Sequence, residues 1–219
     1  MTPEVALLVI AGAAAGGLIN GLAGFGTALF ALGFFLNVMP PVQAVAVVVV
    51  ISALTGLQGL WVVRHAIGNN TRRLARFLLP GIAGIPLGVL VLSVLDARSL
   101  KLVIAGFLIL YGGYFNLRTR LPRFERPAPI WDMFVGLAGG ILGGAASLSG
   151  ALPMMWCALR PWPKAETRAV LQPFNVTVLA LTAAALARLI ARYPTSAQDH
   201  NTPSPIHHHL ARVPRDHRR

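Results

Sequence analysis

Long apolar windows without a charged residue dominate the pattern of this chain. No Asp, Glu, Lys or Arg occurs between Glu4 and Arg64, and four further charge-free windows follow before residue 188. An α-helix rises about 1.5 Å per residue, so each window spans or nearly spans a hydrocarbon core of about 30 Å. An all-α, polytopic membrane protein is therefore predicted, with about six transmembrane helices over residues 5–36, 41–63, 74–95, 100–117, 130–159 and 169–187.

Composition and charge agree with this assignment. Hydrophobic residues make up 55% of the chain and charged residues only 12%, roughly half the charged share of a soluble domain. The formal net charge is +12, but the basic residues lie between the apolar windows. This placement argues against a nucleic-acid partner and in favour of a lipid bilayer.

Arginine-rich connections predict the topology. Residues 64–76 and 118–126 each carry four arginines, as short cytoplasmic loops do under the positive-inside rule. We expect both loops to be cytoplasmic, together with the N-terminus. The first segment lacks a basic leader and is longer than a cleaved signal sequence, so we expect it to be retained.

Two of the apolar segments are too long for a single span. Residues 5–36 would form a helix of roughly 48 Å, and Gly21, Gly24 and Gly26 cluster where it would break. Residues 130–159 are overlong and glycine-rich in the same way.

The two overlong segments belong to an internal repeat. Residues 14–29 align without gaps on residues 137–152 at an offset of 123, which also places Pro40 on Pro163. We expect a first transmembrane repeat of four spans over 1–117, a basic Pro-rich cytoplasmic linker over 118–129, a second, partial repeat of two spans over 130–187, and a polar, disordered tail over 188–219. Consecutive histidines in the tail, at 207–209, usually form only adventitious metal sites, and no functional metal is expected.

Three stretches resemble the sulfite exporter TauE/SafE family of membrane transporters: NGLAGFGTAL, GGAASLSGALP and KAETRAVLQPFNV. The resemblance implies a multi-pass protein of the bacterial inner membrane that moves sulfur-containing or organic anions such as sulfite or sulfonates. It also implies about two further spans where this chain has its polar tail. We therefore expect helix faces without neighbours, poor transport by the 219-residue form, and a homo-oligomer as one means of covering those faces.

Interrupted helices in repeated halves indicate a transporter site near the bilayer midplane. Uncharged donors beside open glycine backbone suit an oxyanion that must be held weakly enough to leave. For each residue alone, helix packing or a hydrogen bond between helices is the simpler role. The candidate substrate-binding residues are Gly21, Gly24, Gly26, Thr27, Ser52, Gly144, Ser147, Ser149, Gly150, Gln172 and Asn175.

Basic residues also lie close to the candidate site. Arg160, Lys164 and Arg168 precede the last span, and alternation of the six spans places them on the external side. They would form an anion-concentrating mouth or, as the favoured interpretation, anchors in the lipid headgroups.

Three other functions compete with transport: a non-transporting membrane scaffold, an inactive truncated transporter and an intramembrane hydrolase. The SLSG sequence at 147–150 is reminiscent of a serine nucleophile, but His65 lies in a basic loop and the other histidines in the tail, so no histidine lies within the spans to activate it. We therefore expect no enzymatic activity and no cofactor.

Overall fold

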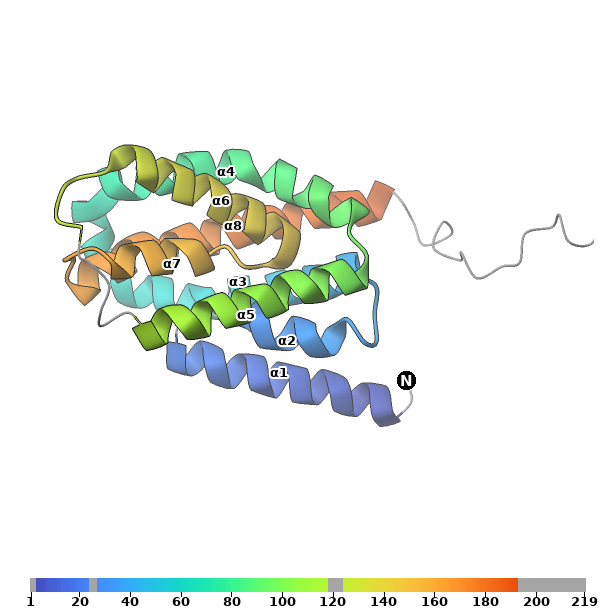
Figure 1. Cartoon of the computed structure of the whole chain (residues 1–219). Helices are drawn as coiled ribbons and strands as arrows, with labels where there is room; N and C mark the ends of the chain where they lie inside the picture. Colours follow the sequence, from blue (N-terminus) through green and yellow to red (C-terminus); the bar gives the residue numbers. More distant parts are fainter. Residues whose placement is uncertain (1–2, 24–26, 118–123, 193–219) are drawn as a thin grey trace, which may run out of the picture. The chain divides into compact units, whose positions relative to one another are not determined.

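The computed structural model describes residues 3–23, 27–117 and 124–192, and within these ranges it is helical with no strand. Figure 1 shows how the helices are arranged. In chain order they are α1 (Pro3–Ala23), α2 (Thr27–Phe35), α3 (Pro41–Ile67), the short 3-10 helix η1 (Gly68–Asn70), α4 (Thr71–Val94), α5 (Ala97–Leu117), α6 (Pro129–Ala146), α7 (Ala151–Ala158) and α8 (Lys164–Arg192).

Five helices of the described chain are long and apolar enough to cross a membrane. They cover Pro41–Ile67, Thr71–Val94, Ala97–Tyr114, Pro129–Ala146 and Lys164–Ala191, and α1 contains a shorter apolar stretch, Ala6–Leu18. The all-α, polytopic fold class is thereby confirmed. The predicted beginning of the tail at Arg188 falls inside α8, because that helix continues to Arg192. Residues 193–219, including the three consecutive histidines, lie outside the described residues.

Both overlong segments are helical hairpins. α1 ends at Ala23 and α2 begins at Thr27, while α6 ends at Ala146 and α7 begins at Ala151. The second member of each hairpin runs back along the first: a Cβ on Gly12 would lie 2.9 Å from Phe34 Cβ, and one on Gly139 would lie 3.0 Å from Pro153 Cγ. The predicted breaks are confirmed, but each segment returns towards the end from which it started.

The boundaries of the helices follow the repeat. At the offset of 123 the end of α1 falls on the end of α6, the end of α2 on the end of α7, and the beginning of α3 on the beginning of α8. Each repeat therefore consists of a hairpin followed by a long helix. α4 and α5 follow this unit in the first repeat and have no counterpart among the described residues.

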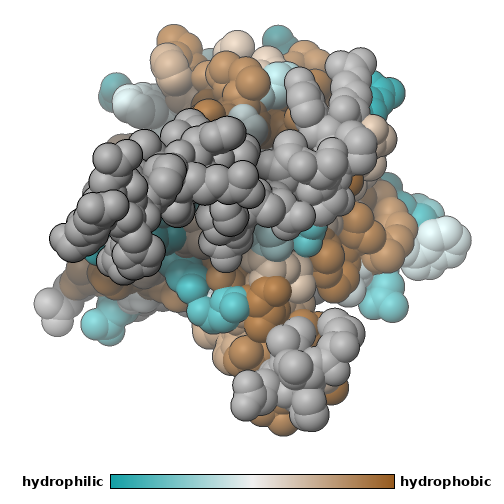
Figure 2. Space-filling view, turned by 90° about the vertical axis from the view of Figure 1, so that its right-hand side faces the viewer, coloured by the Kyte–Doolittle hydropathy of each residue, from teal (hydrophilic) through white to brown (hydrophobic). Residues whose placement is uncertain are grey.

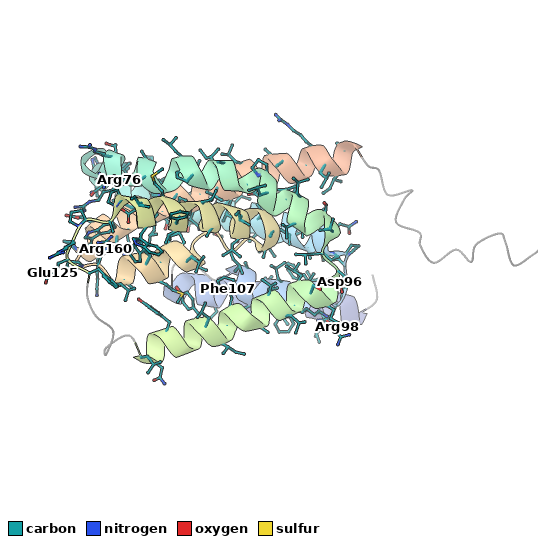
Figure 3. The ribbon with its side chains drawn as sticks, turned by 45° about the horizontal axis from the view of Figure 1, so that its top comes forward. Arg76, Asp96, Arg98, Phe107, Glu125 and Arg160 are labelled. Carbon is teal, nitrogen blue, oxygen red and sulfur yellow. The ribbon has the colours of Figure 1, made fainter. Side chains whose placement is uncertain are left out.

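One end of the helix bundle gathers the basic residues and the tryptophans, and we call it the basic end. Arg73 at the beginning of α4 forms an ion pair with Glu166 at the beginning of α8. The main-chain N–H of Phe124 donates to the carbonyl oxygen of Leu159 at 3.0 Å, which ties the linker to the end of α7. Figure 3 shows Arg76, Glu125 and Arg160 together at this end.

The opposite end joins α2 to α3 and α4 to α5. Lys101 Nζ donates to Asn37 Oδ1 at 2.6 Å, and Figure 3 shows Asp96 and Arg98 here, away from the basic end. The pKa of Asp96 is below its ordinary value, chiefly because of a hydrogen bond with the Ser99 side chain. Figure 2 looks onto this end and shows hydrophobic surface interspersed with hydrophilic groups.

The two ends correct the predicted topology. α1 begins at the opposite end (Figure 1), whereas residues 64–76 and 124–126 lie at the basic end. The beginning of α1 and these basic residues therefore lie at different ends of the bundle, and not at one end as expected. Residues 160–168 lie with the basic loops and not across from them. The expectation was wrong because it counted each hairpin as one crossing.

Glycines let α6 pack closely against its neighbours. On one face, a Cβ on Gly140 would lie only 1.9 Å from the carbonyl oxygen of Gly81 in α4, and one on Gly136 only 2.3 Å from that of Phe77. On another face, a Cβ on Gly143 would lie 2.7 Å from Val178 Cγ1 of α8. Such small-residue contacts are typical of membrane helices, which gain no hydrophobic driving force from lipid and depend on close packing. They hold the α6–α7 hairpin against α4 and α8.

Candidate functional site

A central cavity of about 830 Å³ lies among the two hairpins and the two long helices α3 and α8. Its lining is related by the internal repeat, because several residues from the first half line it together with their counterparts at the offset of 123. The pairs are Ala28 and Ala151, Ala31 and Met154, Phe35 and Ala158, Val48 and Leu171, Ser52 and Asn175, and Gly56 and Leu179. The cavity therefore lies where the two repeats meet.

Five of the predicted site residues line this cavity: Ser52, Ser147, Gly150, Gln172 and Asn175. The hydroxyl oxygens of Ser52 and Ser147 are buried and have no hydrogen-bond partner within the described part of the chain. Gln172 Nε2 donates to the carbonyl oxygen of Gly56 at 2.9 Å and thereby joins α8 to α3. The cavity thus contains donors that are not used by the protein and an amide that also has a structural bond.

Ser149 supports the site from behind. Its side chain is fully buried, it is not part of the lining, and its hydroxyl donates to Asn175 Oδ1. A carboxamide whose oxygen accepts this bond keeps its two N–H donors for another partner. Ser149 therefore fixes the orientation of the Asn175 carboxamide, which lines the cavity.

The break between α6 and α7 brings a helix N-terminus to the cavity. Ser147 adopts a left-handed conformation with φ 58° and ψ 23°, and its N–H donates to the carbonyl oxygen of Gly143 at 3.0 Å. This closure ends α6 as a Schellman-type turn does. Gly150, the residue before α7, lines the cavity and has no side chain to cap the helix. In the first turn of α7, however, Ala151 donates its N–H to the carbonyl oxygen of Leu148 at 3.3 Å and Pro153 has no N–H, so this helix N-terminus has little donor capacity left for the cavity.

The remaining predicted residues are placed differently. Gly144 faces α4, where a Cβ would lie 2.7 Å from the carbonyl oxygen of Ile85, so it serves helix packing and does not line the cavity. Gly24 and Gly26 lie outside the described residues. Gly21 lies in α1 and Thr27 begins α2, and Ala28 next to Thr27 lines the cavity.

The cavity extends towards the basic end and is closed towards the opposite end. Arg160, Trp162, Lys164 and Arg168 are all part of its lining. Towards the opposite end, fully or almost fully buried apolar side chains fill the space between α2 and α3: Leu32, Phe35, Leu36, Val45 and Val49.

Arg160 is buried, with 3% of its side chain exposed, so its favoured interpretation as a headgroup anchor is wrong. Its Nη2 lies 3.7 Å from Oδ1 of Asp132, whose side chain is 4% exposed. The same Oδ1 accepts a hydrogen bond of 2.7 Å from Trp156 Nε1. Asp132 was not among the predicted site residues, because it precedes an apolar window and only the fold brings it to Arg160.

The serine chemistry considered from the sequence lacks a base. The hydroxyl of Ser149 donates to an amide oxygen, which cannot accept a proton as a histidine or carboxylate would. His65, a described histidine, accepts a bond of 3.1 Å from its neighbour Arg64 at the end of α3. The geometry around Ser149 is that of a supporting hydrogen bond.

Comparison with known proteins gives one family and no individual relative. No curated protein and no solved structure matches the chain. The family described as "Sulfite exporter TauE/SafE" matches residues 8–199, which include the second hairpin, all but the first residues of the first hairpin, and the whole cavity lining. The chain, a polytopic membrane protein, therefore belongs to the sulfite exporter TauE/SafE family.

Proposed function

We propose that this chain is a membrane transporter that moves small sulfur-containing or organic oxyanions, such as sulfite or sulfonates, through the central cavity. The observation that carries the proposal is the repeat-related lining: both halves contribute corresponding residues to one cavity at their broken helices. Transporters built from repeats bind substrate in such a place, where half-helix ends offer main-chain donors. Membership of the family supports an anion of the sulfite type.

The chemistry of the lining favours an anion that is bound and then released. The hydroxyl groups of Ser52 and Ser147 and the amide of Asn175 all offer hydrogen-bond donors. None of these groups carries a formal charge, so they hold an oxyanion without the strong attraction that would prevent its release. The basic side chains lie farther along, towards the basic end.

The positive-inside rule supports a location in the bacterial inner membrane with the basic end in the cytoplasm. All four tryptophans of the chain, Trp61, Trp131, Trp156 and Trp162, belong to helices or connections of that end, as expected of aromatic anchors at a membrane interface. In this orientation the cavity faces the cytoplasm, and α1 begins on the other side.

Anion flux in proteoliposomes tests the proposal. The full chain would be reconstituted and loaded with radiolabelled sulfite or methanesulfonate, and efflux would be followed against protein-free vesicles. We expect Asn175→Leu to reduce efflux by about tenfold or more, because it fills the cavity and removes the donor of α8. Gly106→Leu is the matched control, since a Cβ there meets no atom within 4 Å. Absence of flux in the unmodified chain, or equal flux in both variants, would contradict the proposal.

A further inference from the structure

Arg160 lies between two cavities. Beside the central cavity, a second cavity of about 530 Å³ lies at the basic end, and we call it the vestibule. Arg72, Arg73 and Arg76 line the vestibule, with Glu125, Asp132 and Glu166 as acidic neighbours. Arg160 and Trp162 line both cavities. These two residues are therefore shared by the walls of both cavities.

One edge of this guanidinium is unused. Nη1 donates to the carbonyl oxygens of Phe124, at 3.3 Å, and of Arg126. Nε and Nη2 are buried and have no hydrogen-bond partner within residues 3–23, 27–117 and 124–192. These two nitrogens form the planar edge with which arginine binds two oxygens of a carboxylate, sulfonate or phosphate in parallel. A buried donor edge is costly to leave unpaired.

The position of Asp132 explains why the charge of this edge is balanced while its two nitrogens have no hydrogen bond. Its Oδ1 lies 3.7 Å from Nη2, which is near enough for charge attraction and too far for a hydrogen bond. That oxygen is held instead by Trp156 Nε1 at 2.7 Å. Asp132 therefore balances the charge of Arg160 and does not occupy its donors.

Two indole rings fix the plane of the guanidinium. Arg160 Cζ lies 4.6 Å from the centroid of the Trp156 ring and 6.0 Å from that of Trp162. Both distances are within the range of cation–π attraction. Together with the bonds of Nη1, these contacts hold the free edge in one orientation, so that a ligand need not order it.

We propose that the Nε–Nη2 edge of Arg160 is an oxyanion-binding site between the central cavity and the vestibule. Asp132 balances the charge of Arg160 when no anion is bound, and the bound anion takes over this role. The ligand class is an anion with two oxygens on one carbon, sulfur or phosphorus atom. The inference deepens the proposed function and rests on it for the identity of the anion as substrate. Binding to the edge is nevertheless measurable without transport.

Variants that keep the positive charge test whether the Nε–Nη2 edge of Arg160, and not its charge alone, binds the anion. Methanesulfonate would be titrated into the purified full chain in lipid-free detergent by calorimetry. We expect Arg160→Lys to weaken binding about tenfold or more, because a lysine keeps the charge and loses the bidentate edge. Arg98→Lys makes the same change at an exposed residue of the opposite end and should leave the dissociation constant within about twofold. Equal effects of the two variants would overturn the proposal.

For Asp132→Asn we expect tighter binding of the anion, an effect that misfolding cannot produce. The amide keeps the shape and an acceptor for Trp156, but it removes the competing charge. Binding of methanesulfonate should become about tenfold tighter, and the anion should raise the melting temperature more than in the unmodified chain. If the pair is only structural, the variant will lose stability with no gain in affinity, and the proposal fails.

The same chemistry could be supplied by a lipid phosphate. Repeating the titration with phosphatidylglycerol present distinguishes the sources: a free-anion site still binds methanesulfonate, whereas displacement by the lipid at equimolar amounts would overturn the role of the edge as a substrate site. Failure of the proposed function is recognised separately, as absence of flux from vesicles although Arg160-dependent binding persists.

Discussion

At the scale of single residues, Ser147 combines an unfavourable backbone conformation with an unpaired hydroxyl. Ser147 is the non-glycine residue of the described chain that has a positive φ, 58°. Its hydroxyl has no hydrogen-bond partner among the described residues. Left-handed backbone costs a residue with a Cβ roughly 1–2 kcal/mol. A serine kept at such a position is consistent with a hydroxyl that serves the cavity.

Replacing Ser147 with glycine should therefore separate stability from function. Ser147→Gly is expected to raise the free energy of unfolding by about 1 kcal/mol, because glycine adopts this conformation without strain, and to lower anion efflux, because the donor is lost. Denaturation in detergent and vesicle flux measure the two effects.

Ser93→Gly is the control for this change. Ser93 lies in the last turn of α4, where its hydroxyl donates to the carbonyl oxygen of Leu90 at 2.7 Å. Glycine there should lower stability and leave flux unchanged. A Ser147→Gly variant that is destabilised, or that transports normally, would show that the hydroxyl has a structural role only.

At the scale of helices, the glycines of α6 determine how the hairpin is held. Gly136, Gly140 and Gly144 recur every fourth residue and face α4, while Gly139 and Gly143 face α7 and α8. Main-chain atoms of α4 and α6 approach so closely that no side chain fits between them. This contact accounts for Gly144, which the repeat had indicated as a substrate residue.

Gly140→Ala should consequently prevent normal packing. The added Cβ would lie 1.9 Å from the carbonyl oxygen of Gly81, and the main chain cannot move aside as a flexible side chain can. Overpacking of this kind costs roughly 1–3 kcal/mol or more, so a lower melting temperature and less monodisperse protein in size-exclusion chromatography are expected. Gly106→Ala, which meets open space, should behave as the unmodified chain; similar losses in both variants would refute the close contact.

At the scale of the whole molecule, the hairpins decide the topology. Each hairpin returns to its starting end, so the helices that run from one end to the other in the first repeat are α3, α4 and α5. Because three is an odd number, the second repeat begins at the end opposite to the first. The corresponding helices α3 and α8 thus run in opposite directions, and the repeats have inverted topology. Four simple spans in the first repeat would have given parallel repeats instead.

Introduced cysteines test this arrangement. Arg72 and Asp96 are both exposed and lie at the basic and the opposite end. In intact cells, an impermeant thiol reagent should label Asp96→Cys and spare Arg72→Cys, because the basic end is expected in the cytoplasm. The unmodified chain is the control, since its Cys157 is buried. The reverse pattern would invert the orientation, and labelling of both residues would contradict their separation across the membrane.

Much of the fold follows from the order of residues alone. Charge-free windows predict the long helices, because lipid accepts apolar helices whose main-chain groups are paired internally. The glycine cluster predicts a break, and self-similarity at an offset of 123 predicts the corresponding breaks of the two overlong segments and polar groups, Ser52 and Asn175, at corresponding depths of the two halves. These are local or periodic properties, so they can be recognised without knowing which helices are neighbours.

What remained was decided by tertiary contacts. The hydropathy of a broken apolar segment is the same whether the segment crosses the membrane or turns back. Only the packing of α7 along α6 distinguishes the two arrangements. The sequence around a glycine of the second hairpin does not show whether it faces a neighbouring helix, as Gly144 does, or the cavity, as Gly150 does. Arg160 and Asp132 lie 28 positions apart in the sequence, Asp132 in α6 and Arg160 in the connection after α7, and their pairing depends on the return of the hairpin to the basic end. The sequence by itself determined the helices, their breaks and their repetition, because hydropathy and main-chain preference act over a few neighbouring residues. The end of the bundle at which each connection lies, the faces of the glycines and the buried charge pair were decided only by contacts between distant segments.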